Sequence, residues 1–219
     1  MENELIRKIT EGRQYRPTAE ILRIKEESNG DGENKEMIVE GHASTFNQPY
    51  ELYDDGEYRI EEQIDSEAFR ECDMSDVIMQ YNHEGRIFAR MRNNTLEVKT
   101  DETGLYIRAN LGGTEEGRKL YQEIKDGYTD RMSFGFTVSE DKVERINNRD
   151  DNKITVLRTI TKVRKLYDVS AVSIPANDGT DISARSYSDG VIERLKAERL
   201  EERAKLEAEK AKAMALLEL

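Results

Sequence analysis

Short stretches in which apolar and polar residues alternate run through the middle of the chain, and they predict β-strands. They lie at residues 19–25, 36–46, 77–82, 95–99, 105–111 and 132–138, and in much of 153–174. Segments rich in turn-forming residues separate two pairs of these stretches, at 28–35 and at 101–104. This arrangement predicts that the first pair, and likewise the pair around 101–104, forms a β-hairpin.

Two stretches within this region predict helices. Residues 114–126 begin with Thr114, a preferred N-cap residue, and acidic residues follow it directly. Three apolar residues of this helix are expected to face the core: Leu120, Tyr121 and Ile124. A shorter helix is predicted at 66–72, with Ser66 as its N-cap.

The composition changes after about Ser188. Residues 191–219 are nearly all Glu, Lys, Arg, Ala and Leu, with no Pro or Gly, and they predict one long helix. Its apolar residues fit a heptad repeat poorly, because Arg199, Glu202 and Glu209 interrupt the seam. Two interpretations stay open: a solvated helix stabilised by ion pairs four residues apart, and a tail that binds a partner.

Composition narrows the class of protein. The 219 residues carry 34 Lys and Arg against 46 Asp and Glu, a formal net charge of −12, so no attraction to nucleic acid is expected. No apolar run reaches the ~18 residues of a membrane span, and residues 1–14 are polar, expected to be flexible, and without a signal-peptide core. We therefore expect a soluble intracellular protein. The single Cys72 excludes an internal disulfide and a cysteine-based zinc site.

Only two histidines, His42 and His83, are available for chemistry that needs an imidazole. His83 follows the apolar strand predicted at 77–82 and precedes a loop, so it lies at an edge that a substrate could reach. His42 lies inside the strand predicted at 36–46, where a structural role is the better interpretation.

Ser133 stands between large apolar residues of a predicted strand, and Gly135 follows two positions later. A glycine inside a strand often marks a close approach by backbone or ligand. Ser133 is therefore either a packing residue or a nucleophile presented on a strand.

Asp168 interrupts the apolar alternation of the stretch 166–176. An unpaired buried carboxylate is costly, so it would need a partner such as a histidine N–H. Ser133, His83 and Asp168 on neighbouring strands would form a nucleophile with its general base. The alternative is an Asp168 side chain that is exposed or paired with a lysine.

Residues 41–176 resemble the prohead (capsid maturation) protease family of tailed bacteriophages with HK97-type capsids. The order and spacing of short motifs carry the resemblance, which covers about three quarters of the chain with the preceding hairpin. The motifs are Gly41-His42-Ala43-Ser44-Thr45-Phe46-Asn47, Tyr81-Asn82-His83, Thr95-Leu96, Asp101-Glu102-Thr103-Gly104-Leu105, Leu111 with Thr114, Met132-Ser133-Phe134-Gly135-Phe136, Asp168-Val169-Ser170 and Pro175-Ala176.

This resemblance implies a serine endopeptidase. It places the family's histidine on His83, its nucleophile on Ser133 and the acidic member of its site on Asp168. Asp130 is nearer to Ser133 in sequence, but residues three apart on one strand face opposite sides. The similar herpesvirus assembly proteases use a second histidine as third member. No histidine follows His83 here, so a carboxylate, or no firm third member, is expected.

The resemblance also implies an α+β fold: a compact, mainly antiparallel β-barrel with flanking helices, to which the sequence adds the long C-terminal helix. The expected layout is a flexible N-terminus at 1–14, a protease domain at 15–187 and a charged helical tail at 188–219. A homodimer is implied only by analogy with the herpesvirus enzymes.

The implied chemistry is that of a serine protease. Ser133 attacks a peptide carbonyl, His83 takes its proton, Asp168 orients His83, and backbone N–H groups stabilise the oxyanion. No metal or cofactor is needed. The implied substrates are scaffold protein, the scaffold-like segment of the major capsid protein, and the protease itself. Cleavage would occur inside a procapsid assembling in the bacterial host cytoplasm, where the tail would dock to scaffold or be cut.

Other classes fit the residues less well. A non-enzymatic scaffold or assembly factor with a protease-like fold would be favoured by loss of a site residue, and all three residues are present. A zinc hydrolase lacks a recognisable ligand spacing. A Cys72–His83 pair would place the nucleophile at the end of a short helix. A hydrolase of small esters would lack its G-x-S-x-G motif.

Overall fold

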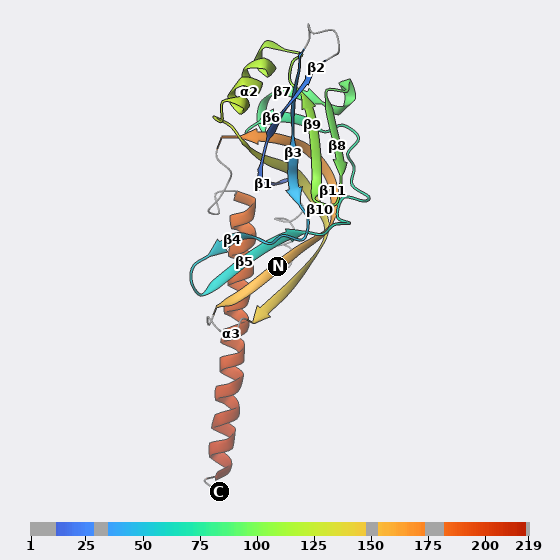
Figure 1. The fold of residues 1–219 in the computed structure, drawn as a ribbon. Coiled ribbons are helices and arrows are strands. Elements are labelled where there is room, and N and C mark those ends of the chain that lie inside the picture. Colours follow the sequence, from blue (N-terminus) through green and yellow to red (C-terminus); the bar gives the residue numbers. More distant parts are fainter. Residues whose placement is uncertain (1–11, 29–34, 148–152, 174–181, 218–219) are drawn as a thin grey trace.

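The computed structural model of the chain describes residues 12–28, 35–147, 153–173 and 182–217. Two open β-sheets, helix α2 (Glu115–Lys125) and the long helix α3 (Ile182–Leu217) make up the α+β fold (Figure 1). The first sheet has the strand order β1 (Gln14–Ile21), β10 (Arg131–Asn147), β11 (Ile154–Val172), β5 (Tyr58–Ile64) and β4 (Tyr50–Asp54). The second has the order β2 (Arg23–Ser28), β3 (Lys35–Thr45), β9 (Gly104–Asn110) and β8 (Leu96–Thr100).

Strand β11 is the centre of the first sheet. It is 19 residues long and pairs with the 17-residue β10 over its whole length. On its other side, its first half pairs in parallel with β5, and its second half pairs in parallel with β6 (Ile78–Tyr81). Strand β6 in turn pairs with β7 (Glu84–Arg90), and the 3-10 helix η1 (Met91–Asn93) follows. The β10–β11 pair therefore belongs to two regions of the molecule, one at each half of β11.

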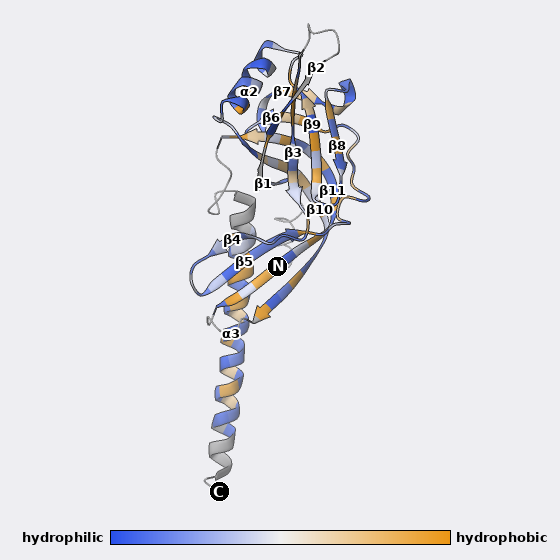
Figure 2. Ribbon diagram, in the orientation of Figure 1, coloured by the Kyte–Doolittle hydropathy of each residue, from blue (hydrophilic) through white to orange (hydrophobic). Residues whose placement is uncertain are grey.

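Each region has its own apolar core. The larger core lies between the second half of β11, its neighbouring strands, the second sheet and α2. The smaller core joins β4, β5 and the first half of β11 to the early turns of α3 through Tyr187, Val191, Ile192 and Leu195. The apolar residues on the sheets and the largely hydrophilic far part of α3 are visible in Figure 2.

The expected closed β-barrel is wrong. Among the described strands, β1, β4 and β7 end the first sheet and β2 and β8 end the second, and no pairing joins these edges. The reason lies in β10 and β11, whose register is irregular at several points between Gly135 and Asp141. Such bulges bend and twist a strand pair. Beyond this bend the pair leaves the larger core and supports the smaller one.

Several predicted elements are confirmed. Strands β2 and β3 pair as the first hairpin, although turn residues 29–34 lie outside the described residues. The run at 19–25 is divided at the buried Leu22, so that its two halves enter different sheets. In α2 the Thr114 hydroxyl accepts a hydrogen bond from the Gly117 N–H at 2.9 Å. The three expected core residues of this helix are buried: Leu120, Tyr121 and Ile124.

The predicted helix at 66–72 is wrong. This segment forms successive turns, and Glu67 N–H bonds the Asp65 side chain rather than that of Ser66. The carbonyl of Ala68, which would accept an intrahelical bond, instead accepts one from Val163 N–H of β11 at 2.8 Å. Attachment to β11 therefore replaces helical hydrogen bonding.

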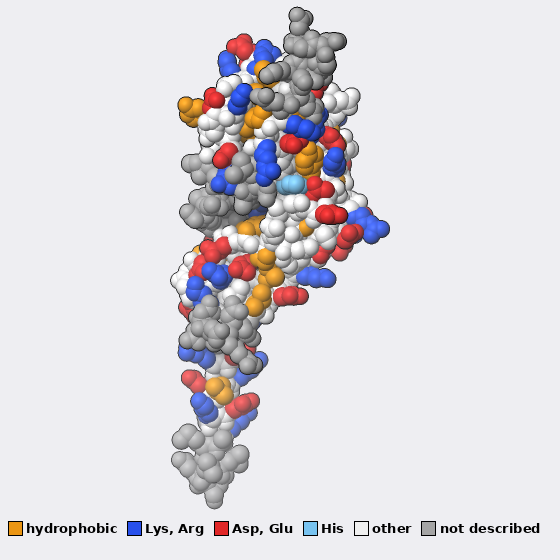
Figure 3. All heavy atoms as spheres, viewed as in Figure 1, with side chains coloured by type: hydrophobic (Ala, Val, Ile, Leu, Met, Phe, Trp, Pro, Cys, Tyr) orange, Lys and Arg blue, Asp and Glu red, His pale blue; other side chains and the backbone are white. Residues whose placement is uncertain are grey.

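The long C-terminal helix is confirmed, and it begins at Ile182, before the residues that predicted it. Its exposed part carries acidic and basic side chains on the face shown in Figure 3, and Leu200 and Leu206 are 66% and 51% exposed. No described helix is apolar enough over 18 residues to cross a membrane. Of residues 1–14 the structure describes 12–14, and Gln14 already belongs to β1. The domain limits after residues 14 and 187 stay predictions, and Pro175-Ala176 and residues 218–219 lie outside the described residues.

Candidate active site

The structure brings Ser133, His83 and Asp168 together. Ser133 lies on β10, Asp168 on the adjacent β11, and His83 in the turn that leaves β6, the strand on the other side of β11. The Ser133 Oγ is 2.6 Å from Nε2 of His83. The other ring nitrogen, Nδ1, is 2.6 Å from Oδ1 of Asp168. A neutral imidazole satisfies both contacts when Nδ1–H donates to the carboxylate and Nε2 accepts from the hydroxyl.

The turn that carries His83 has an unusual backbone. Asn82 and His83 are the two residues between β6 and β7, and both have positive φ angles, 49° and 61°. Glycine is preferred at the second position of such a turn, so a histidine there is strained. The turn is held by Asn82, whose N–H bonds the Ala171 carbonyl and whose Oδ1 accepts from Ser173 N–H at 3.1 Å. These bonds fix the imidazole against the end of β11.

Asp168 is fully buried, and each of its two oxygens has partners. Oδ1 accepts from His83 and from the Ser170 hydroxyl at 2.7 Å, and Oδ2 forms an ion pair with Arg13. Burial raises the pKa of this carboxyl, but the hydrogen bonds from His83 and Ser170 and the charge of Arg13 outweigh it and lower the pKa below its ordinary value. Asp168 is therefore an ionised partner for His83 at neutral pH.

Gly135 provides the space for this carboxylate. It is the direct cross-strand partner of Asp168. A Cβ at this position would collide with Oδ2 of Asp168 and would lie 2.9 Å from Nε of Arg13. The sequence indicates a close approach at Gly135. In the structure, the groups that approach its backbone are the side chains of Asp168 and Arg13.

Comparison with known proteins shows the family of the chain. Residues 22–192, more than half of the chain, match the sequence profile of the caudovirus prohead serine proteases. The chain belongs to this family. It is 27% identical over 161 residues to the prohead protease of Enterobacteria phage HK97, a match that covers 73% of this chain and 65% of that protein. The matched region is thus slightly less than two thirds of the relative's length. A solved structure, that of the bacteriophage T4 capsid assembly protease, aligns with a TM-score of 0.46 and 13% identity over 74% of this chain and 98% of that chain.

Other candidate residues of this prohead protease family member lie apart from the Ser133 hydroxyl. His42 is in the second sheet, where Nε2 is 2.8 Å from Oδ2 of Asp101. Both ring nitrogens of His83 are already bonded, so His83 does not pair with Cys72. Burial raises the Cys72 pKa to about 11, and the thiol is therefore neutral at physiological pH. The Asp130 carboxylate is 3.5 Å from its neighbour Arg131.

Sequence reasoning missed Arg13 and Ser170, the two other partners of Asp168. Ser170 carries a usable signal, since it lies two residues from Asp168 on the same strand and thus on the same face. Arg13 carries none, because 155 positions separate it from Asp168. Among the described residues, no three His, Cys, Asp or Glu side chains are grouped so as to hold a metal ion.

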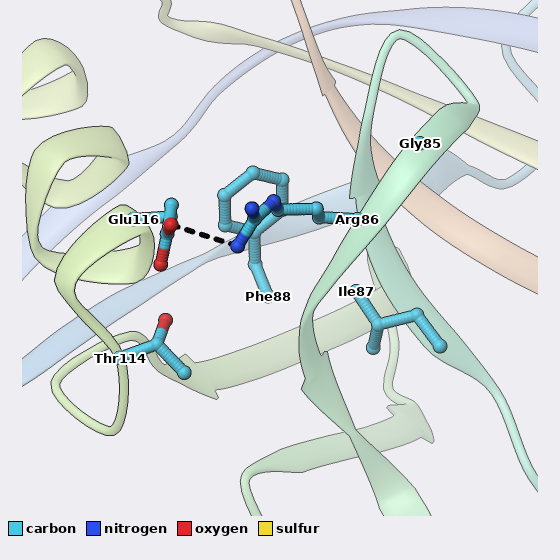
Figure 4. Close-up of a pocket in the computed structure, with 6 residues that line it drawn as sticks. All are labelled: Gly85, Arg86, Ile87, Phe88, Thr114 and Glu116. Carbon is cyan, nitrogen blue, oxygen red and sulfur yellow. Dashed lines mark hydrogen bonds and ion pairs between the residues drawn. The ribbon is translucent and has the colours of Figure 1, made fainter.

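A pocket of about 340 Å³ lies beside β7, and Gly85, two positions after His83, is one of its lining residues. Strand β7 contributes residues 85–88, and the start of α2 contributes Glu116 and its N-cap Thr114. Figure 4 shows Arg86 reaching across the pocket to Glu116, with Nη1 and Oε1 at 2.7 Å. The pocket thus shares a hairpin with His83.

Proposed function

We propose that this chain is a serine endopeptidase of procapsid maturation, with Ser133 as nucleophile, His83 as general base and acid, and Asp168 as the anionic partner of His83. One observation carries the proposal: the continuous pair of 2.6 Å contacts from Ser133 Oγ through the His83 ring to Asp168. Membership in the caudovirus prohead serine protease family supports the same reading.

Each group has a defined part in the reaction. The Ser133 hydroxyl proton passes to Nε2 of His83 as Oγ bonds to the carbonyl carbon of the scissile peptide. The imidazolium, stabilised by Asp168, then gives its proton to the leaving nitrogen as the C–N bond breaks. Water, deprotonated by His83, hydrolyses the resulting ester and restores Ser133.

The substrates we propose are scaffold protein, the scaffold-like segment of the phage major capsid protein, and the chain itself. The HK97 relative is named as a prohead protease, which places that protein in capsid assembly. Inside a procapsid in the host cytoplasm, confinement raises the local concentration of these targets, so modest sequence selectivity would suffice.

We propose that the exposed part of α3 docks to scaffold or is itself cut. Tyr187, Val191 and Leu195 belong to the smaller core, and Arg199 is 2.5 Å from Glu57 of the body. A truncation that tests the tail should therefore end after Arg199, so that the core stays complete. Packaging and capsid maturation equal to those of the full chain would contradict both roles for the remaining residues.

The experiment that tests the protease is co-expression with the capsid and scaffold proteins of the same phage, read by intact mass. Ser133→Ala is compared with Ser139→Ala, an exposed serine on the same strand. We expect cleavage with the full chain and with Ser139→Ala and none with Ser133→Ala. Cleavage that persists in Ser133→Ala contradicts the serine mechanism. Normal shells without cleavage in any sample would favour the alternative, a non-catalytic assembly factor.

A further inference from the structure

The two faces of β1 have different surroundings. The side chains of Gln14 and Arg16 are buried on one face, whereas Tyr15 and Arg13, the residue directly before the strand, lie on the other side, next to the candidate active site. This alternation follows from the pleat of a strand. Tyr15 is the cross-strand partner of Gly135, and its ring centroid is 4.3 Å from that of His83.

A buried ion cluster holds the first face of β1. Nε of Arg16 is 2.5 Å from Oε1 of Glu62, and Nη1 of Arg158 is 2.7 Å from Oε2 of the same carboxylate. Oε1 of Gln14 accepts from both arginines, at 3.0 and 3.1 Å. Burial raises the pKa of Glu62, but the charges of Arg16 and Arg158 outweigh it and lower the pKa to about 2. The cluster is therefore fully charged, and it ties β1 to β5 and β11.

Arg13, directly before β1, reaches Asp168 on the side of this second face. The Arg13 guanidinium carbon is 5.2 Å from the centre of the Tyr15 ring and 4.7 Å from that of Tyr167, so the group lies against both rings. Its Nη2 binds Oδ2 of Asp168 through the space that Gly135 leaves open. The side chain is one third exposed, whereas the carboxylate is completely buried.

We infer that Arg13 is a positioning residue, which fixes the plane of the Asp168 carboxylate so that Oδ1 stays on the Nδ1–H of His83. The inference rests on the proposed function. His83 and Ser170 share Oδ1, and Arg13 holds Oδ2. The carboxylate is thereby fixed at both oxygens, and an arginine, whose planar group offers several donors, suits this task better than a lysine.

This role adds to what the family comparison gives. The match to the caudovirus prohead serine proteases begins at residue 22, after the end of β1 at Ile21. Arg13 and Tyr15 therefore lie outside the residues that match the family profile.

The test uses the full chain and the variants Arg13→Gln and Arg13→Lys, with Arg23→Gln, an exposed arginine of β2, as the matched control. The first readout is the proton NMR signal of His83 Nδ1–H, which is separated from His42 by a His42→Gln background. We expect the signal to move or broaden in Arg13→Gln, to be partly restored in Arg13→Lys, and to stay unchanged in Arg23→Gln.

The second readout is the cleavage rate. We expect Arg13→Gln to lower kcat by about 10- to 100-fold with little change in KM, because it disturbs geometry rather than substrate binding. An unchanged NMR signal together with an unchanged kcat in Arg13→Gln would overturn the inference. Failure of the protease proposal is separate: it would appear as absent cleavage by the full chain, or as cleavage by Ser133→Ala, whatever the NMR signal shows.

Discussion

Gly135→Ala is the sharpest test of how this site is built, because it removes no chemical group. Gly135 has no positive φ angle, so its backbone conformation is one that alanine adopts easily. The only new feature is a methyl group directed at Oδ2 of Asp168 and at the Arg13 guanidinium. Both groups are held from other sides. His83 and Ser170 bind Asp168, and two tyrosine rings contact Arg13. One of them must move.

The expected loss of kcat depends on how far Asp168 or Arg13 is displaced. A displacement of about 1 Å in a catalytic arrangement costs about 100-fold in rate, and loss of the carboxylate's help to the imidazole costs about 10⁴-fold. We therefore expect kcat to fall by between about 100-fold and about 10⁴-fold. The effect on folding should be small, because overpacking costs ~1–3 kcal/mol and the lower chain entropy of alanine returns ~0.4–1 kcal/mol.

The assay compares kcat for cleavage of the capsid or scaffold substrate with the midpoint of thermal unfolding. The control is Gly113→Ala, because a Cβ at Gly113 would meet nothing within 4 Å. Both variants should fold, and only Gly135→Ala should lose activity. Cleavage by folded Gly135→Ala at the rate of the unmodified chain would contradict this prediction, since Asp168 and Arg13 would then not need the space that Gly135 leaves.

Three further changes test other parts of the molecule. Glu62→Gln removes the anion between two buried arginines and should lower the free energy of unfolding in urea by ~3–5 kcal/mol. Because the fold lowers the Glu62 pKa from 4.5 to about 2, its stabilising contribution is complete above pH 4.5 and is lost as the pH falls toward 2; an unchanged acid dependence in the variant would contradict this. Gly117→Ala should lower the Tm, because the new Cβ would collide with the Leu111 carbonyl. This is the opposite of the usual effect of alanine, which stabilises a helix by ~1 kcal/mol relative to glycine. A higher Tm would show that the contact relaxes. Ser170→Ala deletes one hydrogen bond to Asp168 and should lower kcat about tenfold, the equivalent of ~1.4 kcal/mol, while steady-state kinetics with no change in kcat would mean that His83 and Arg13 suffice.

Local sequence patterns were sufficient to predict much of the fold. The alternation around Ser133 and Asp168 predicts two strands, and these strands pair as β10 and β11. The N-cap and apolar spacing at 114–126 predict α2 with its core residues. These predictions succeed because each depends on neighbours a few positions away, which the sequence displays directly.

The features that local sequence patterns did not predict depend on contacts between distant parts of the chain. Strand β5 alternates regularly between buried and partly buried side chains, but one of its buried positions is Glu62, so the sequence does not look like a half-buried strand. Closure of a barrel depends on how β11 divides its length between β5 and β6, which no local pattern encodes. Ser133 and Asp168 were found because each is unusual in its own strand, and His83 because it is one of only two histidines, whereas Arg13 is an ordinary arginine in a polar segment.

The buried charges also explain how β1 keeps its register. A slip of one residue would exchange the two faces of the strand, placing Gln14 and Arg16 at the active site and burying Arg13 and Tyr15. The buried side chains at positions 14 and 16 are polar, so the ion cluster and not an apolar pattern resists such a slip at this end of β1. A buried ion cluster resists it strongly, since Glu62 and Arg158 would lose partners that water cannot replace. Loss of the anion in Glu62→Gln should therefore reduce catalysis as well as stability, because Arg13 would be held less firmly opposite Asp168.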